Sequence, residues 1–572
     1  MEYFLTMDRS VDVRSVYQNI TFRILVVLGL ILNGIGSLWN VDPYHEGALF
    51  PTSVGIAEGL SVFSGVSQQY GFLGPLLVSF PIRIFGNYLI IQRIFGFFVT
   101  IVIARLFYLN LKKITSEQIS RIIIVTWLMI SPIWSWPLNR NALSGGYWPN
   151  QIGLIFVLLG LLLIQRESSR VHQIMAGVTV FISSQARMEF YFVWLFVTLA
   201  VLIFKGRKAK SFLLGSLLGL SLTIIFLLLQ GSLQDWYAQT ILVWTLTPPD
   251  VPKIGINFFL FNGMNFIGVG LVAILLLVSS YYVTYKVEKF FIRLSIQITI
   301  TTTLLFATSK IQIKQKIGNF SVGSYVDYVF GNTLFSFVNL TIFVFLSGLA
   351  LKLAEYRFNI VKFCDGIGVI NTLYVASTLG TLSLFHNFNP DYSYMVWPLF
   401  ILSVLILFKG SLNRHSSKII ETLGLATTAI SAVSVLTFVL HAQGQFHPYQ
   451  TKMLSGLFGH SLESVTELDR AFSRISVYSQ PKKMLMVCQT GLYSTSHSGF
   501  LGLDKWTWNQ QPQVMISNRF DNLEKGQTIL ACKLNTQDSE SISQLLKLEK
   551  IRLVSNSPQF KLYKVIESYR QQ

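Results

Sequence analysis

Long apolar runs recur along the first 441 residues of this 572-residue chain and constrain its fold more than any other feature. Most are long enough to cross a hydrocarbon core of ~30 Å as a helix. The sequence therefore predicts an all-α polytopic membrane domain over residues 1–441, with about thirteen transmembrane helices. The predicted spans are 22–39, 88–112, 122–138, 151–164, 174–186, 190–204, 212–229, 264–282, 294–308, 332–351, 367–384, 394–408 and 419–440. The short runs 174–186 and 190–204 also fit one broken re-entrant element.

Charge placement predicts the orientation of these spans. The chain is 52% hydrophobic and 13% charged, with a net charge of +18. Loops assigned to the inside hold about eighteen Lys and Arg residues, against five in loops assigned to the outside, as the positive-inside rule requires. No basic stripe interleaved with aromatics accompanies the charge, so nucleic acid is not an expected partner. We expect a cytoplasmic N-terminus in a bacterial plasma membrane, with a retained first span.

The tail, residues 442–572, changes character. Short apolar runs at 484–488, 528–532 and 560–566 alternate with polar turns, and a helical pattern covers 539–548. These features predict a small α+β domain, which the charge rule places outside the membrane. Cys488 and Cys532 each end a predicted strand, so they fit either a disulfide or two buried thiols.

The first predicted outer loop carries the strongest chemical signal. Between residues 40 and 74 it contains no Lys or Arg, yet it holds Asp42, His45, Glu46 and Glu58. Carboxylates clustered beside a membrane repel one another unless they bind a partner or take up a proton. Residues 50–63 fit an amphipathic helix in the interface. Ordinary solvated loop acids are the alternative interpretation.

Further ionisable residues lie in or near the predicted spans, where unpaired charge is costly. Arg83 lies shortly before the second span, and Arg93 lies within it. Arg187 and Glu189 interrupt an apolar stretch; two residues apart, they do not face each other on a regular helix, so a break with separate partners competes with a substrate role. Three cations, Lys310, Lys314 and Lys316, depart from the positive-inside pattern, and Asp391 lies in the last predicted outer loop.

Several motifs resemble the GT-C class of glycosyltransferases, which includes protein O-mannosyltransferases and aminoarabinose transferases. The motifs are Asp42…His45-Glu46-Gly47, Glu58-Gly59, Tyr70-Gly71…Gly74-Pro75, Gln92-Arg93, Ala176-Gly177 through Arg187-Met188-Glu189, and Asn389-Pro390-Asp391…Tyr394…Pro398. The layout of many spans followed by an outer domain is also similar to that class. No Asp-x-Asp motif occurs, which disfavours the metal-dependent oligosaccharyltransferase branch.

The resemblance implies a transfer of sugar from a polyprenyl-phosphate donor in the membrane to a glycan, lipid or protein acceptor of the cell envelope. It implies Asp42 as the first choice of base, Glu46 as the second and His45 as an orienting residue. Phosphate-binding cations would be Lys310, Lys314, Lys316, Arg83 and Arg93; the substrate cavity would involve Glu58, Tyr70, Arg187, Glu189, Asp391 and Tyr394. No metal and no cofactor are expected.

Other functions stay open at this point. A transporter or flippase of lipid-linked glycans is the main alternative, although such proteins place ionisable residues near the midplane between repeated halves. An O-antigen-type ligase or polymerase and a non-catalytic glycan-binding scaffold are further alternatives. Neither the sugar, the acceptor nor the isoprenoid length can be read from the sequence.

Overall fold

The structure is a computed structural model of the whole chain. It describes residues 13–39, 41, 45–64, 66, 70–135, 148–165, 169–203, 207–242, 341–342, 344–382, 390–408, 447–459, 462–463, 465–467, 469–470, 484–487, 522–523, 525–531, 536–556 and 561–570, with scattered positions between 279 and 300.

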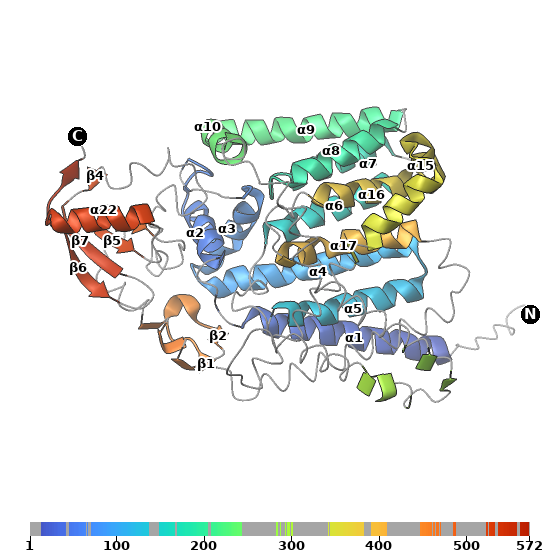
Figure 1. Ribbon diagram of the computed structural model, residues 1–572, viewed down its shortest axis with the longest axis horizontal. Coiled ribbons are helices and arrows are strands. Elements are labelled where there is room, and N and C mark those ends of the chain that lie inside the picture. The colour runs from blue at the N-terminus through green and yellow to red at the C-terminus, as the bar shows by residue number, and fades with distance from the viewer. Residues whose placement is uncertain are drawn as a thin grey trace, which may run out of the picture.

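The described part of the first 441 residues is helical. Its longer helices lie side by side, and two shorter ones, α2 and α3, cross one end of the bundle (Figure 1). The elements are α1 (Val13–Ser37), α2 (His45–Ala57), α3 (Leu73–Phe85), α4 (Leu89–Ile114), α5 (Glu117–Ser135), α6 (Pro149–Gln165), α7 (Arg170–Ser183), α8 (Phe190–Ile203), α9 (Arg207–Leu229), α10 (Leu233–Trp236), the π-helix η1 (Tyr237–Leu242), α15 (Ile360–Ile367), α16 (Val369–Thr381) and α17 (Pro390–Leu407).

Several predicted spans coincide with described helices. In the described part of the chain, three helical segments, at 20–37, 89–114 and 209–229, are long and apolar enough to cross a membrane. A fourth candidate is the pair α15 and α16, which bends by 119° at Gly368. Predicted spans 264–282, 294–308 and 419–440 lie wholly or largely outside the described residues, so the count of thirteen stays a prediction.

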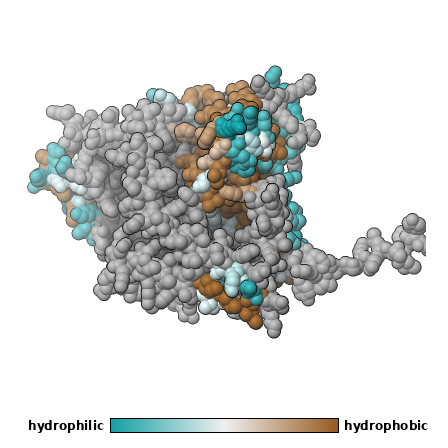
Figure 2. Space-filling model, turned by 45° about the vertical axis from the view of Figure 1, so that its right-hand side comes forward, coloured by the Kyte–Doolittle hydropathy of each residue, from teal (hydrophilic) through white to brown (hydrophobic). Residues whose placement is uncertain are grey.

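The outer surface of the bundle carries many exposed apolar side chains. Helix α9 exposes large apolar side chains along its length, including Leu217 at 60%, Leu228 at 59% and Leu229 at 82%. Figure 2 shows the hydrophobic surface over the described helices in brown. Apolar area of this extent is not left facing water, and long apolar helices with exposed apolar faces are those of a multi-pass membrane protein.

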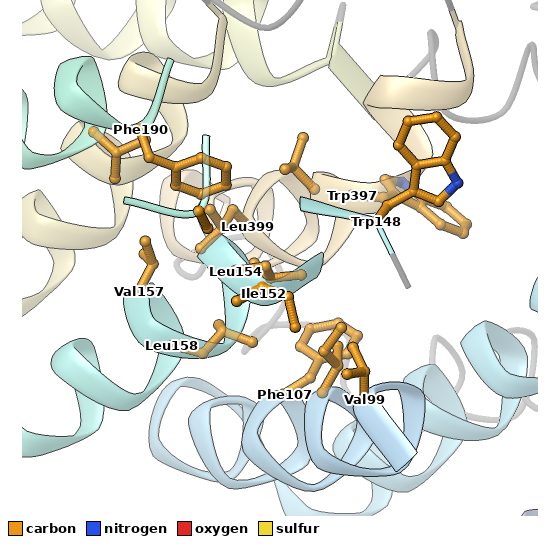
Figure 3. Close-up of a cluster of buried hydrophobic side chains, with 14 of the residues drawn as sticks. Val99, Phe107, Trp148, Ile152, Leu154, Val157, Leu158, Phe190, Trp397 and Leu399 are labelled. Atoms are coloured by element: carbon orange, nitrogen blue, oxygen red, sulfur yellow. The ribbon is translucent and has the colours of Figure 1, made fainter. Parts of the chain in front are cut away.

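Inside the bundle, helices approach closely through glycine. A Cβ on Gly177 of α7 would lie 2.0 Å from the carbonyl oxygen of Phe212, and one on Gly215 of α9 would lie 2.0 Å from that of Ile174. Small residues of this kind let helix backbones pack tightly in membranes. The main core fills the space between α4, α6, α8 and α17, with Val99, Phe107, Leu158, Phe190 and Leu399 among its members (Figure 3).

The tail forms sheets where the sequence predicts strands. A four-stranded sheet has the order β3 (Met484–Val487), β5 (Thr528–Ala531), β7 (Lys561–Val565), β6 (Ile551–Asn556), with β3 and β5 parallel. Helix α22 (Thr536–Lys547) agrees with the predicted helix and joins a small separate core that includes Ile529 and Ile542. Strands β4 (Asn522–Leu523) and β8 (Tyr569–Arg570) pair beside it. Cys488 and Cys532 lie outside the described residues.

Candidate functional site

Charged and polar side chains gather at the end of the bundle crossed by α2 and α3, called here the α2 end. Helices α4 and α6 begin there, and the break between α7 and α8 lies there too (Figure 1). The prediction of a helix in the first loop is confirmed, but its bounds differ: α2 covers His45–Ala57, and α3 is a second short helix before the expected span. Both short helices run across the direction of the longer ones.

A buried ion pair fastens α2 to α4. The guanidinium of Arg93 donates from Nε to Oε1 of Glu46 at 2.5 Å and from Nη2 to Oε2 at 2.7 Å. Its Nη1 also donates to the backbone oxygens of Ser37 and Trp39, each at 3.0 Å. Arg93 is 0% and Glu46 3% exposed. This fork geometry is the strong form of a carboxylate–arginine contact.

The ion pair involves two residues that the sequence assigned to the site. Glu46, the second choice of base, is buried and places both carboxylate oxygens on Arg93. Arg93, which the resemblance assigns to the phosphate-binding cations, donates to Glu46 and to two backbone carbonyl oxygens. In this conformation the pair joins α2 to α4.

The first choice of base, Asp42, lies outside the described residues, and so does the side chain of His45. The residues around them are fixed: Val41 is 5% exposed and joins the main core, and Trp39 is held by Arg93. Glu46 anchors the other side. The described residues on either side, Val41 and Glu46, are therefore both held in the buried interior.

A second buried ion pair fills the break between α7 and α8. The Nε of Arg187 donates to Oε2 of Glu189 at 2.8 Å, and its Nη2 lies 2.7 Å from Oε1 of the same carboxylate. Its Nη1 donates to Oδ1 of Asn150 at 3.1 Å, and its guanidinium lies 4.9 Å from the ring centre of Tyr70. The expected break is confirmed, but the expectation of separate partners is wrong, because the non-helical turn brings Arg187 and Glu189 face to face.

Backbone hydrogen bonds join the residues at the start of α3 to this break. The amide of Gly71 donates to the oxygen of Ala186 at 3.1 Å, and that of Leu73 donates to Gln185 at 3.1 Å. A Cβ on Gly71 would lie 1.9 Å from the oxygen of Gln185, so only glycine permits this approach. Tyr70 packs edge-on against Trp148, whose side chain is also buried.

Arg83 is an exposed cation at the α2 end. Its Nε donates to the oxygen of Ala57 at 2.9 Å and its Nη2 to that of Ile56 at 3.3 Å, so it closes the last turn of α2. Phe80 and Phe85 beside it on α3 are 73% and 64% exposed. Just beyond the ends of the two short helices, Nδ2 of Asn87 donates to Oε1 of Glu58 at 3.1 Å. A cation on an apolar, lipid-facing helix suits an amphiphilic anion.

The remaining candidates are not all described. Lys310, Lys314 and Lys316 lie outside the described residues. Asp391 and Tyr394 fall in the first two turns of α17, but their side chains are not described. Among the described residues, no three His, Cys, Asp or Glu side chains gather in a way that could hold a metal ion.

A segment near the start of the tail, which the sequence did not single out, covers the Glu46–Arg93 pair. It contains β1 (His447–Pro448), the 3-10 helix η3 (Lys452–Leu454) and β2 (Phe458–Gly459). The amide of Phe458 donates to the oxygen of Leu38 at 3.0 Å. Burial raises the pKa of Tyr449 well above its usual value, opposed by the nearby Arg93. The short strands give no periodic signal, which explains why they went unpredicted.

The chain was compared with known proteins and solved structures. No protein-family model and no curated protein matches it. Among solved structures, ArnT of Cupriavidus metallidurans in its apo state is similar at 9% identity and a TM-score of 0.41, over 96% of this chain and 98% of that one. The same protein bound to undecaprenyl phosphate gives 10% identity and 0.38, with the same coverage. The archaeal oligosaccharyltransferase AglB of Archaeoglobus fulgidus, in complex with an inhibitory peptide and a dolichol-phosphate, gives 11% and 0.43, over 90% and 70%.

Proposed function

We propose that this protein is a membrane glycosyltransferase that moves a sugar from a polyprenyl-phosphate donor to a glycan, lipid or protein acceptor of the cell envelope. In this proposal the α2 end faces the outside of a bacterial plasma membrane. The N-terminus is then cytoplasmic, and residues 442–572 form an extracytoplasmic domain.

The observation that carries the proposal is the buried Glu46–Arg93 pair. It holds Glu46, together with the backbone of Ser37 and Trp39, at one end of an apolar bundle, next to a lipid-facing helix that carries Arg83. A catalytic carboxylate must be held within hydrogen-bond reach of its proton donor. A donor with a long isoprenoid chain stays in the bilayer, so its phosphate meets the protein at such an end.

The proposed reaction is a direct displacement with inversion. Asp42 takes the proton of the acceptor hydroxyl as its oxygen attacks the anomeric carbon. The bond from that carbon to the phosphate oxygen breaks, and the polyprenyl phosphate leaves with the bonding electrons. Arg83 stabilises the charge that develops on the phosphate, and Lys310, Lys314 and Lys316 are proposed to assist.

The same proposal assigns roles around the reacting atoms. His45 orients Asp42. Glu58, Tyr70, Asp391 and Tyr394 line the substrate cavity.

Arg187 and Glu189 shape one wall of that cavity. They are rigid because they pair with each other. The proposed reaction uses no metal and no cofactor besides the lipid-linked sugar.

Replacement of Asp42 by Asn tests the proposal. In vesicles containing the purified protein and a radiolabelled polyprenyl-phosphate sugar, Asp42→Asn should lower transfer by roughly a hundredfold or more and leave donor binding intact. The matched control is Asp365→Asn, on exposed α15 at the other end of the bundle, which should keep full activity. Unchanged transfer by Asp42→Asn would refute the proposed base, and movement of intact lipid-linked sugar across the bilayer without transfer would favour the flippase alternative.

A further inference from the structure

One buried side chain at the α2 end has no hydrogen-bond partner. Gln92, on α4 immediately before Arg93, is 0% exposed, and in the described structure neither Oε1 nor Nε2 of its amide is hydrogen-bonded. An amide can accept two hydrogen bonds and donate two. Buried polar groups in native proteins are nearly always paired, so an unpaired one requires an explanation.

The same face of α4 carries a matched amide that is fully engaged. Asn110 lies 18 residues further on, which is five helical turns, so both side chains share one face about 27 Å apart. Asn110 is also 0% exposed, yet its Nδ2 donates to the oxygens of Leu106 and Leu158, and its Oδ1 accepts from the hydroxyl of Tyr374 at 2.5 Å. A buried amide on this face can therefore make all its hydrogen bonds, and the Gln92 amide differs because it makes none in the described structure.

The position of Gln92 points to the proposed reaction centre. Val99, seven residues along, shares its face and belongs to the cluster between α4, α6 and α17 (Figure 3). Gln92 therefore lies towards the α2 end of the same interior face. The adjacent Arg93 holds Trp39 and Glu46, which flank the segment containing Asp42.

We infer that the Gln92 amide binds a carbohydrate hydroxyl, supplied by the donor sugar or by a glycan acceptor. A hydroxyl both donates and accepts a hydrogen bond, and so it can bond to both Oε1 and Nε2 of one amide. Such a contact selects the sugar, because a substrate without the matching hydroxyl leaves the amide unpaired. This inference rests on the proposed function.

Stability in the absence of substrate provides the first test. In the full-length protein in lipid nanodiscs, Gln92→Leu should raise the unfolding midpoint, because it removes an unpaired amide from an apolar face. The matched control Asn110→Leu should lower the midpoint, because it removes the three hydrogen bonds that Asn110 makes to Leu106, Leu158 and Tyr374. Gln92→Met, closer in shape, serves if the Leu variant packs poorly. A lower midpoint for both Gln92 variants would show that the amide supports the fold and would overturn the inference.

Substrate binding provides the second test and identifies the source of the hydroxyl. Undecaprenyl phosphate is compared with undecaprenyl phosphates carrying mannose, glucose or arabinose, by the rise in unfolding midpoint each produces. If the donor sugar is bound, Gln92→Leu loses the extra rise caused by the sugar and keeps the rise caused by the bare lipid. If a glycan acceptor is bound, the donor responses stay normal and the acceptor KM rises roughly three- to tenfold.

The possible failures are distinguishable. Equal donor responses and an equal acceptor KM in Gln92→Leu and wild type would overturn the assignment of Gln92 alone. A wild-type protein that responds to none of the four lipids would instead contradict the proposed function.

Discussion

Removal of Arg93 should destabilise the protein more than neutralisation of Glu46. Arg93→Met deletes four hydrogen bonds, two to Glu46 and two to the carbonyl oxygens of Ser37 and Trp39. It also leaves a carboxylate buried at 3% exposure without its cation. Breaking one side of a buried ion pair costs about 3–5 kcal/mol. Glu46→Gln keeps one acceptor oxygen and the shape of the side chain, so we expect a cost of about 1–3 kcal/mol.

The assay is unfolding in mixed micelles titrated with SDS, followed by tryptophan fluorescence for each single variant and for the double variant Glu46→Gln/Arg93→Met. The double variant removes both charges, so its cost should be smaller than the sum of the two single costs. A cost below about 1 kcal/mol for Arg93→Met, or additive costs, would refute the claim that this pair anchors α2.

Three further perturbations follow from the same geometry. Arg187→Lys loses the forked contact to its carboxylate partner and the stacking on an aromatic ring, and should cost about 1–3 kcal/mol of stability in the same titration; a neutral result would show that the contact at the α7–α8 break is not structural. Gly177→Ala places a methyl group 2.0 Å from the oxygen of Phe212, so α7 and α9 must separate, at a cost of about 1–3 kcal/mol, and unchanged stability would contradict the close crossing. Burial raises the pKa of Tyr449, so its contribution to stability is complete below about pH 10 and is lost as the pH rises from there through the folded value. Tyr449→Phe should therefore lose less stability than wild type between about pH 9 and about pH 11, and equal losses would refute the burial of this phenol.

The pattern of apolar residues predicted those helices and strands whose environment stays the same along their length. Helix α4 begins within a residue of the expected position, and the strands β3, β5 and β7 fall within the predicted apolar runs. These segments follow one rule along their whole length, either apolar burial in lipid or alternation on a sheet.

Side-chain pairing could not be predicted in the same way. Glu46 and Arg93 are 47 residues apart, and nothing in either local sequence indicates that they meet. Arg187 and Glu189 pair because the turn between α7 and α8 is not helical, whereas helical spacing places them on different faces. The unpaired amide of Gln92 is likewise a property of the packed interior.

The short helix α3 was missed because Gly74 and Pro75 signal a turn. They lie in its first turn, where proline is tolerated. The covering segment 447–459 was missed because its strands are only two residues long.

A structure of the protein with a polyprenyl phosphate bound tests the central claim most directly. The account predicts that the phosphate lies at the α2 end, within hydrogen-bond distance of Arg83, with Asp42 facing it across a cavity and the isoprenoid chain on the exposed apolar side of α3. A phosphate bound at the opposite end of the bundle, or midway along the helices and remote from Asp42, would contradict it.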